Sequence, residues 1–236
     1  MKAPALPDRR RSLGVIVPSA NIVVERAALQ FASRDGGVDF HFARVPVRGG
    51  QNPDRQEYDI DAFVAAATLL ADAKPQGLFW AGSKGVLAGV NAERKLQSEI
   101  ELRSGLPFTS CTLALIELLK NTSFKRVGLI TPYTSAYQRV LIAGLRSVGI
   151  DCVAEAHAGI ADNFAYAGVP ASQIVAMAKG VAVERPDFVL AWCTNFSSAT
   201  HFDLIRSEID LPFIDATLLG FEHAIALLEP DCPLPQ

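Results

Sequence analysis

A thiol and two hydrogen-bonding residues follow a short apolar run, at a place where α/β proteins often perform chemistry. Residues 188–192 (FVLAW) lead directly into Cys193, which begins the tripeptide CTN. Short apolar runs bounded by turn-forming residues are typical of buried parallel strands. Ligands of open α/β sheets bind just beyond the carboxyl ends of such strands. We therefore expect Cys193 to be catalytic, with neighbouring polar groups and backbone N–H groups available to an anion.

A similar stretch occurs in the first half of the chain. Residues 77–83 (GLFWAGS) again contain an apolar run, a tryptophan and small residues. Aligning Trp80 with Trp192 places Ala81 opposite Cys193. Two further pairs of segments follow in the same order, 13–18 with 127–132 and 105–109 with 210–214. We infer two similar halves with one site between them, which has a thiol on one side and none on the other.

Strand-like and helix-like segments alternate along the chain. The expected strands are residues 13–17, 38–45, 77–80, 106–108, 126–130, 151–157, 188–192 and 211–214. The expected helices are residues 23–32, 60–73, 91–104, 112–120, 135–148, 172–184 and 218–228. This alternation predicts an α/β fold of two pseudo-symmetric Rossmann-like lobes, each a short parallel sheet flanked by helices, with the active site between them.

The repeat also predicts the limits of the lobes. We place the first lobe at residues 1–112 and the second at residues 113–215. The last segment, 216–236, is expected to pack back on the first lobe. A polar, glycine-containing loop at residues 46–58 is long enough to act as a cover.

The composition excludes several classes of protein. At 236 residues the chain is long enough for a large core or for two small lobes. The formal net charge is −3 and there is no basic stripe, so nucleic acid is not an expected partner. No apolar stretch has the length of a membrane span. Residues 1–11 lack the apolar segment of a signal peptide, so we expect a cytoplasmic protein.

Neither a metal nor an organic cofactor is expected. The four cysteines show no CxxC or metal-ligand spacing and are expected to be free thiols. They are Cys111, Cys152, Cys193 and Cys232. The four histidines form no metal-binding motif. The first expected strand leads into Pro18 and Ser19 instead of a glycine-rich turn, which disfavours a nucleotide-binding site.

Loops at the expected strand ends share small and hydrogen-bonding residues. Four of them, 18–21, 81–85, 131–134 and 193–195, follow strands, and a long loop at 158–170 can reach over them. The candidate binding residues in these loops are Pro18, Ser19, Asn21, Ala81, Gly82, Ser83, Tyr133, Asn163 and Thr194. Hydroxyls, amides and backbone N–H groups can hold a carboxylate, and also the enediolate that forms when the adjacent carbon loses a proton or CO₂.

A thiol beside that carbon can supply or remove a proton. A thiolate needs a lowered pKa, which a loop of N–H groups beside a helix N-terminus can provide. On this basis Cys193 is the proton-transferring residue of the expected site.

Four segments together resemble the aspartate/glutamate racemase superfamily, and within it the maleate cis-trans isomerase branch and arylmalonate decarboxylase. They are residues 17–25 (VPSANIVVE), 131–134 (TPYT), 160–164 (IADNF) and 192–195 (WCTN). The resemblance implies two pseudo-symmetric lobes, no cofactor and often a homodimer. It also implies that Asn21, Tyr133 and Asn163 bind a substrate carboxylate. Cys193 would be the second of two catalytic thiols.

One loop departs from the pattern of the superfamily. Its racemases and maleate isomerases have a first catalytic cysteine in a loop that corresponds here to residues 80–85 (WAGSKG). The internal repeat places the missing thiol at Ala81, whereas matching Gly85 to the glycine of the motif places it at Gly82. Neither residue can be a nucleophile or a base. The binding residues therefore favour the maleate isomerase branch, while the single thiol is similar to arylmalonate decarboxylase.

Each candidate residue also has a purely structural interpretation. Cys193 could be a buried core cysteine, and Asn21 could be a helix N-cap that also frames an anion site. Tyr133 and Asn163 could be ordinary turn residues, although the combined motif favours function. Lys84 is more typical of a solvated loop charge than of a group that replaces the missing thiol.

We expect a cofactor-independent enzyme that acts on a small dicarboxylic acid. With one thiol, the most coherent chemistry is decarboxylation of a malonate-type acid, followed by protonation of an enediolate by Cys193. The main alternative is a maleate isomerase-like or racemase-like enzyme in which Lys84 or a water replaces the first thiol. A further alternative is a carboxylate-binding protein without catalytic activity.

Overall fold

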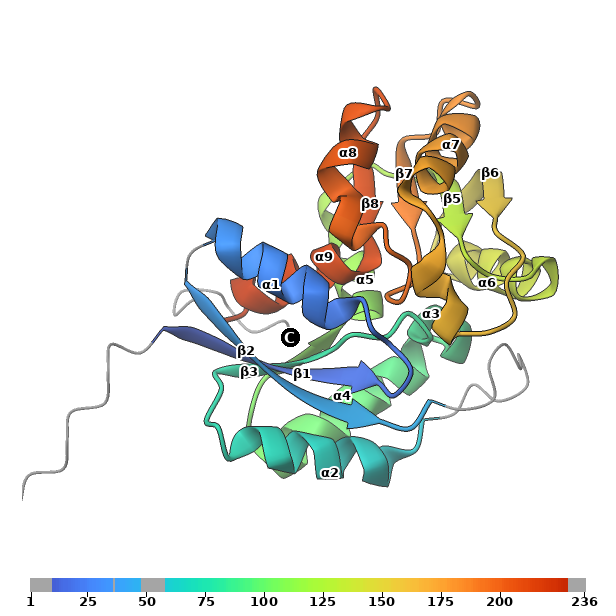
Figure 1. Ribbon diagram of the computed structural model, residues 1–236. Coiled ribbons are helices and arrows are strands. Elements are labelled where there is room, and N and C mark those ends of the chain that lie inside the picture. The colour runs from blue at the N-terminus through green and yellow to red at the C-terminus, as the bar shows by residue number, and fades with distance from the viewer. Residues whose placement is uncertain (1–9, 36, 48–57, 229–236) are drawn as a thin grey trace, which may run out of the picture.

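The fold consists of two parallel four-stranded sheets that repeat one topology (Figure 1). The computed structural model describes residues 10–35, 37–47 and 58–228. The first sheet contains β1 (Arg11–Pro18), β2 (Val38–Val45), β3 (Gly77–Trp80) and β4 (Phe108–Ser110), in the order β2-β1-β3-β4. The second contains β5 (Arg126–Thr131), β6 (Asp151–His157), β7 (Phe188–Ala191) and β8 (Phe213–Asp215), in the order β6-β5-β7-β8. The predicted α/β architecture of two similar lobes is confirmed.

Helices cover both faces of the first sheet. Helix α1 (Val24–Asp35) lies on one side of it, and α2 (Ile60–Ala71) and α4 (Val90–Ser104) lie on the other (Figure 1). A single turn, α3 (Gly85–Ala88), follows β3. The helical segments of the second lobe are α6 (Ser135–Ser147), η1 (Phe164–Gly168), α7 (Ala171–Ala182), η2 (Ala199–His201) and α8 (Phe202–Ser207).

Two equivalent helices, α5 (Cys111–Asn121) and α9 (Ala216–Ala226), follow the last strand of each sheet and pack against each other. Helix α9 also contacts β3, β4 and α1 of the first lobe. Its Phe221 ring lies 5.6 Å from Phe31, 5.1 Å from Phe40 and 5.5 Å from Phe79, measured between centroids. The last helix therefore completes the inner core of the first lobe.

The strands divide their side chains between two hydrophobic cores. Phe79 belongs to a large core that continues from the first lobe into the second. Its neighbours Leu78 and Trp80 point to the opposite face of β3, as strand geometry requires, and join a smaller core with α2 and α4. Removing each such large side chain from water contributes about 2 kcal/mol to stability. Both cores together hold the carboxyl ends of the strands in place.

Some boundaries differ from those predicted from the sequence. Strands β4 and β8 begin two residues later than expected, after Pro107 and Pro212, because proline has no N–H to donate to a neighbouring strand. The hydrophobic periodicity of the sequence did not predict α3 and α8, because these helices are too short to show it. Most of the predicted cover loop at 46–58 lies outside the described residues, as does Cys232.

Candidate active site

The register of the two sheets determines which residues of the lobes are equivalent. Trp80 of β3 pairs with Ile16 of β1, and Ala191 of β7 pairs with Ile130 of β5. Ile16 and Ile130 are themselves equivalent in the repeat, because each stands two residues before the proline that follows it. Trp80 therefore corresponds to Ala191, and the alignment of the two tryptophans is wrong by one residue.

This register places a glycine opposite the thiol. One residue beyond the pairs, Ala81 and Trp192 each donate the backbone N–H to the first strand of their lobe. Gly82 is therefore the counterpart of Cys193, so the prediction that placed Ala81 there is wrong. Because its N–H is part of the sheet, Ala81 has no backbone donor left for a ligand.

The side chain of Trp80 fills the space beside Gly82. A Cβ atom on Gly82 would overlap the indole and lie only 2.7 Å from its Nε1. The indole is 1% exposed and packs edge-on against Phe63, with centroids 4.7 Å apart. A cysteine at position 82 would therefore require the indole to move.

Cys193 is buried at the end of β7, with 4% of its surface exposed. Burial, with a smaller contribution from the nearby carboxyl of Asp215, raises the pKa of its thiol to about 12. Hydrogen bonds with Tyr133 and with the backbone of Asn195 and Phe196 act in the opposite direction but do not prevail. The N–H groups of the loop therefore do not bring this thiol into the thiolate form. The environment instead favours a neutral S–H group, which is the form that donates a proton.

A buried acid that the sequence analysis missed lies behind the thiol loop. Asp215 accepts hydrogen bonds from the backbone N–H groups of Thr217 and Leu218 and so caps α9. Its second oxygen accepts the hydroxyl of Ser198 at 2.6 Å. Burial raises the pKa of Asp215 to about 6, so this carboxyl changes charge in the acidic range. A helix N-cap pattern was its only sequence signal.

The hydroxyl of Tyr133 connects the two sides of the site. It lies 3.1 Å from the hydroxyl of Ser83 on the first lobe and forms a hydrogen bond with the thiol of Cys193. The Tyr133 ring is buried against Tyr137 and Tyr166, at centroid distances of 4.7 and 5.4 Å. This aromatic packing holds the hydroxyl at the junction between the thiol and the loop that contains Gly82.

Asn21 is both a helix cap and a contact between the lobes. Its Oδ1 accepts the backbone N–H groups of Val23 and Val24, and its Nδ2 donates to Thr194 Oγ1 at 3.1 Å. The residue is 1% exposed. An amide nitrogen has two protons, so one N–H of Asn21 remains for a ligand. Thr194 is thereby fixed beside Cys193.

Asn195 joins three loops and was not among the predicted binding residues. Its Oδ1 accepts the backbone N–H of Ile22 at 2.9 Å, and its Nδ2 donates to the backbone carbonyl of Asn163 at 2.6 Å. The side-chain amide of Asn163 makes no hydrogen bond with any residue that the structure describes. Asn195 therefore positions the loops, while Asn163 keeps its amide for another contact.

Arg44 supports the turn after β1 from outside and was also missed. Its guanidinium donates to the backbone carbonyls of Pro18, Ser19 and Asn21, at 3.4, 3.2 and 2.7 Å. Ser19 is exposed, and its hydroxyl accepts the N–H of Val47. Pro18 and Ser19 thus shape the turn in this structure, and no sequence pattern connects them with Arg44.

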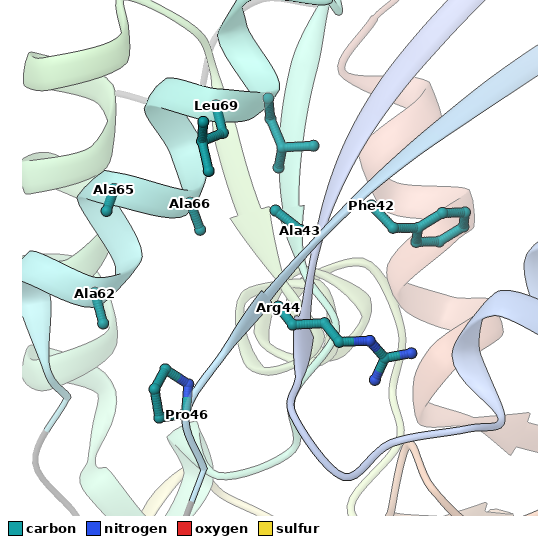
Figure 2. A pocket seen from close by; sticks show the side chains of 9 residues that line it. Phe42, Ala43, Arg44, Pro46, Ala62, Ala65, Ala66 and Leu69 are labelled. Carbon is teal, nitrogen blue, oxygen red and sulfur yellow. The ribbon is translucent and has the colours of Figure 1, made fainter.

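The pocket in Figure 2 is separate from this constellation. It has a volume of about 460 Å³ and lies between β2 and α2. Alanines and leucines of α2 form one wall, and the guanidinium of Arg44 points away from that helix (Figure 2). Such an apolar lining without convergent polar groups offers little to a dicarboxylate.

The part of the chain that the structure describes contains neither a candidate metal cluster nor a candidate membrane-spanning helix. Within residues 10–35, 37–47 and 58–228, no three His, Cys, Asp or Glu side chains are grouped so that they could hold a metal ion. Every helix in the same ranges is too short or too polar to cross a lipid bilayer. Cys111, Cys152 and Cys193 are free thiols.

Two similar lobes of parallel sheet, with a thiol loop facing a second strand-end loop, define the aspartate/glutamate racemase superfamily. Within it, the chain belongs to the arylmalonate decarboxylase family, whose model matches residues 13–235. The resemblance inferred from the sequence motifs is confirmed. Proteins similar to this chain include enzymes of isomerase and decarboxylase type.

Individual relatives include both types. A maleate isomerase of Nocardia farcinica is 24% identical, covering 95% of this chain and 93% of the relative. A maleate isomerase of Pseudomonas putida is 23% identical, covering 87% of each chain. Among solved structures, a Pseudomonas putida maleate isomerase variant with maleate has a TM-score of 0.82 at 19% identity, covering 92% of this chain and 91% of its own. Arylmalonate decarboxylase has a TM-score of 0.72 at 19% identity, covering 94% of each chain.

Proposed function

We propose that the protein decarboxylates a malonate-type dicarboxylic acid without a cofactor, and that Cys193 protonates the resulting enediolate. The observation that supports this most directly is that Cys193 of the second lobe and Gly82 of the first lobe occupy equivalent positions. A single protonated thiol can deliver a proton to one face of a carbanion. The two-thiol route of isomerisation needs a nucleophile on the opposite loop, where this chain has a glycine beside the Trp80 indole.

The substrate would be held by groups from both lobes. Ser83 and Tyr133 supply hydroxyls at the centre of the site, and Asn21 keeps one N–H besides the one that it donates to Thr194. Backbone N–H groups of the loop at 82–85 add donors without adding charge. Donors fixed before the reaction stabilise the charge that develops in the transition state, which here is the enediolate.

The reaction has two steps that balance in atoms and charge. The bond between the substrate's α-carbon and one carboxylate breaks, CO₂ leaves, and the electron pair forms the enediolate of the remaining carboxylate. The Cys193 S–H then protonates the α-carbon, and the thiolate takes a proton from water. The raised pKa of Cys193 supports this sequence, because the thiol begins each cycle protonated and its thiolate is a strong base.

A maleate isomerase is the second candidate, and the names of the curated relatives favour it. It would require another nucleophile on the first lobe. Lys84 is a poor replacement in this geometry, since its ammonium lies over the Tyr58 ring at 5.6 Å from the centroid. A water held by the hydroxyls of Ser83 and Tyr133 would be the remaining choice.

The two candidates give different products from a defined panel of acids. The purified protein, treated with a chelator, is incubated with phenylmalonate, methylphenylmalonate and maleate in D₂O, and the products are followed by proton NMR. We expect loss of CO₂ and stereoselective incorporation of one deuterium at the α-carbon. Conversion of maleate to fumarate without decarboxylation would refute the decarboxylase and favour the isomerase.

Two cysteine variants make the assay specific to the thiol. Cys193→Ser should lower turnover at least a hundredfold while phenylmalonate still binds, since a hydroxyl is a much weaker acid than a thiol. Cys152→Ser is the matched control, because Cys152 is a free, half-buried thiol on the edge strand β6. An equal loss of turnover in both variants would show that the substitutions impair folding and not a specific step at the Cys193 thiol.

A further inference from the structure

A buried carboxyl group lies directly behind the loop that faces Cys193. Glu93, in the first turn of α4, is fully buried. Its Oε2 accepts the hydroxyl of Tyr58. A Cβ on Gly85 would overlap this carboxyl and lie 2.5 Å from Thr112 Oγ1. The loop at 82–85 can therefore follow its path only because both of its glycines leave room, Gly82 for an indole and Gly85 for a carboxyl.

Three buried polar atoms belong to this cluster. Trp80 Nε1, Glu93 Oε1 and Thr112 Oγ1 are buried, and none has a hydrogen-bond partner within the described part of the chain. A buried carboxylate without full pairing is costly, and such a group usually takes up a proton instead. The arrangement therefore favours a neutral carboxylic acid at Glu93.

Burial outweighs the neighbouring groups that favour an ionised Glu93. Burial raises the pKa of Glu93, while hydrogen bonds from Ser110 and Tyr58 oppose the shift. The other titratable groups that face the cluster are Cys111 at the start of α5 and Lys84 before α3, whose ammonium lies over the Tyr58 ring.

We propose that Glu93 is a positioning residue that supports the loop at 82–85 from behind and, by remaining uncharged, allows that loop to hold a dicarboxylate. This inference rests on the proposed function, because it concerns the loop that would bind the substrate. An ionised carboxylate beside Gly85 would repel a dianion that the loop holds. A neutral acid supports the same geometry without that repulsion.

The protonation state can be tested without any ligand. A raised pKa means that the native state binds the proton more tightly than the unfolded chain does, so stability falls as pH rises above the unfolded value. The Tm of the wild type is compared with that of Glu93→Gln between pH 4.5 and pH 8.5. We expect the variant to gain stability relative to the wild type as pH rises. Glu99→Gln, on the same helix but partly exposed, is the control and should show no such trend.

The role in binding is tested in a background that does not turn over. Phenylmalonate affinity is measured by calorimetry at pH 5.5 in Cys193→Ser, alone and combined with Glu93→Gln, Glu93→Ala or Glu99→Ala. The amide keeps the shape and neutrality of the acid, so Glu93→Gln should bind within about twofold of its parent. Glu93→Ala removes the support and should bind about tenfold more weakly, while Glu99→Ala should bind normally.

Two results would overturn the inference. One is a Tm difference between wild type and Glu93→Gln that does not change with pH, which would mean that the acid ionises normally. The other is a loss of binding in Glu93→Gln as large as in Glu93→Ala, which would mean that the charge itself is needed. If no variant, including the Cys193→Ser parent, binds a dicarboxylate, the proposed function fails and the role in binding with it, while the Tm series still decides whether Glu93 is neutral.

Discussion

The Trp80 indole occupies the position that a side chain on Gly82 would need. Gly82 is also the counterpart of Cys193 in the other lobe, as the paired registers require. The asymmetry of the site therefore involves more than one substitution, because a thiol cannot be added to the first lobe without repacking the smaller core.

Gly82→Cys should destabilise the protein by about 2 kcal/mol, because the new side chain must displace a packed indole. It should also fail to confer conversion of maleate to fumarate. Combining it with Trp80→Leu should recover part of the lost stability. Thermal unfolding and an NMR assay on maleate check both statements. Gly180→Cys is the control, since a Cβ there meets no atom within 4 Å; a Gly82→Cys protein as stable as this control would contradict the packing argument.

Asp215→Asn should lower the pKa of the Cys193 thiol, because the substitution removes a nearby negative charge. Asparagine also caps helices, so α9 should remain formed. The pH dependence of Cys193 alkylation by iodoacetamide, followed by peptide mass spectrometry, measures the change. An unchanged profile would show that the charge of Asp215 does not contribute to the thiol pKa.

The same variant should change the stability of the protein in acid. The pKa of Asp215 is about 6 in the native state against an ordinary value of 3.8. The stabilisation by its proton is therefore fully present below pH 3.8 and is lost as pH rises through 6. Ionisation of the native group then costs about 3 kcal/mol. The free energy of unfolding, measured with urea, should decrease less between pH 4 and pH 7 in Asp215→Asn than in the wild type.

Tyr133→Phe should lower kcat/KM about a hundredfold, the usual effect of removing one donor to a developing oxyanion. Ser83→Ala should also weaken the stabilisation of this oxyanion, since the hydroxyls of Ser83 and Tyr133 lie 3.1 Å apart. A double-mutant cycle measured on kcat/KM should therefore show coupling of about 1 kcal/mol or more. Strict additivity would mean that the two hydroxyls act independently.

Asn195→Ala should destabilise the protein by about 3 kcal/mol, because it leaves the N–H of Ile22 and the carbonyl of Asn163 without their partner. It should also weaken substrate binding, since the loops of both lobes lose a shared contact. Urea unfolding and substrate titration measure these effects. Asn121→Ala, at an exposed helix end, is the control. If Asn195→Ala is as stable as the wild type, the three loops are held together by other contacts.

The sequence predicted the elements and the thiol because their signals are local. Apolar runs, caps such as Asn21 and the strand end at Cys193 can be recognised within ten residues. The repeat alignment failed by one residue because it matched two tryptophans that point into different cores. The correct match depends on pairing between strands, which the sequence does not display.

The missed residues act through contacts between distant segments. Asn195 accepts a hydrogen bond from Ile22, 173 positions away in the chain. Glu93 accepts one from Tyr58, 35 positions away. Asp215 and Arg44 have ordinary sequence surroundings, and their roles follow from what the fold brings beside them. The pKa of Cys193 belongs to the same class, because burial sets it and burial is a property of the whole fold.

The position of Phe221 has a consequence for the synthesis of the chain. A ribosome releases the first lobe long before the last helix, yet Phe31, Phe40 and Phe79 require that helix to close their core. Chains grow at about 5–20 residues per second, so the first sheet waits for several seconds with an open apolar face. Completion of the first lobe is therefore a late event, which follows the synthesis of the whole second lobe.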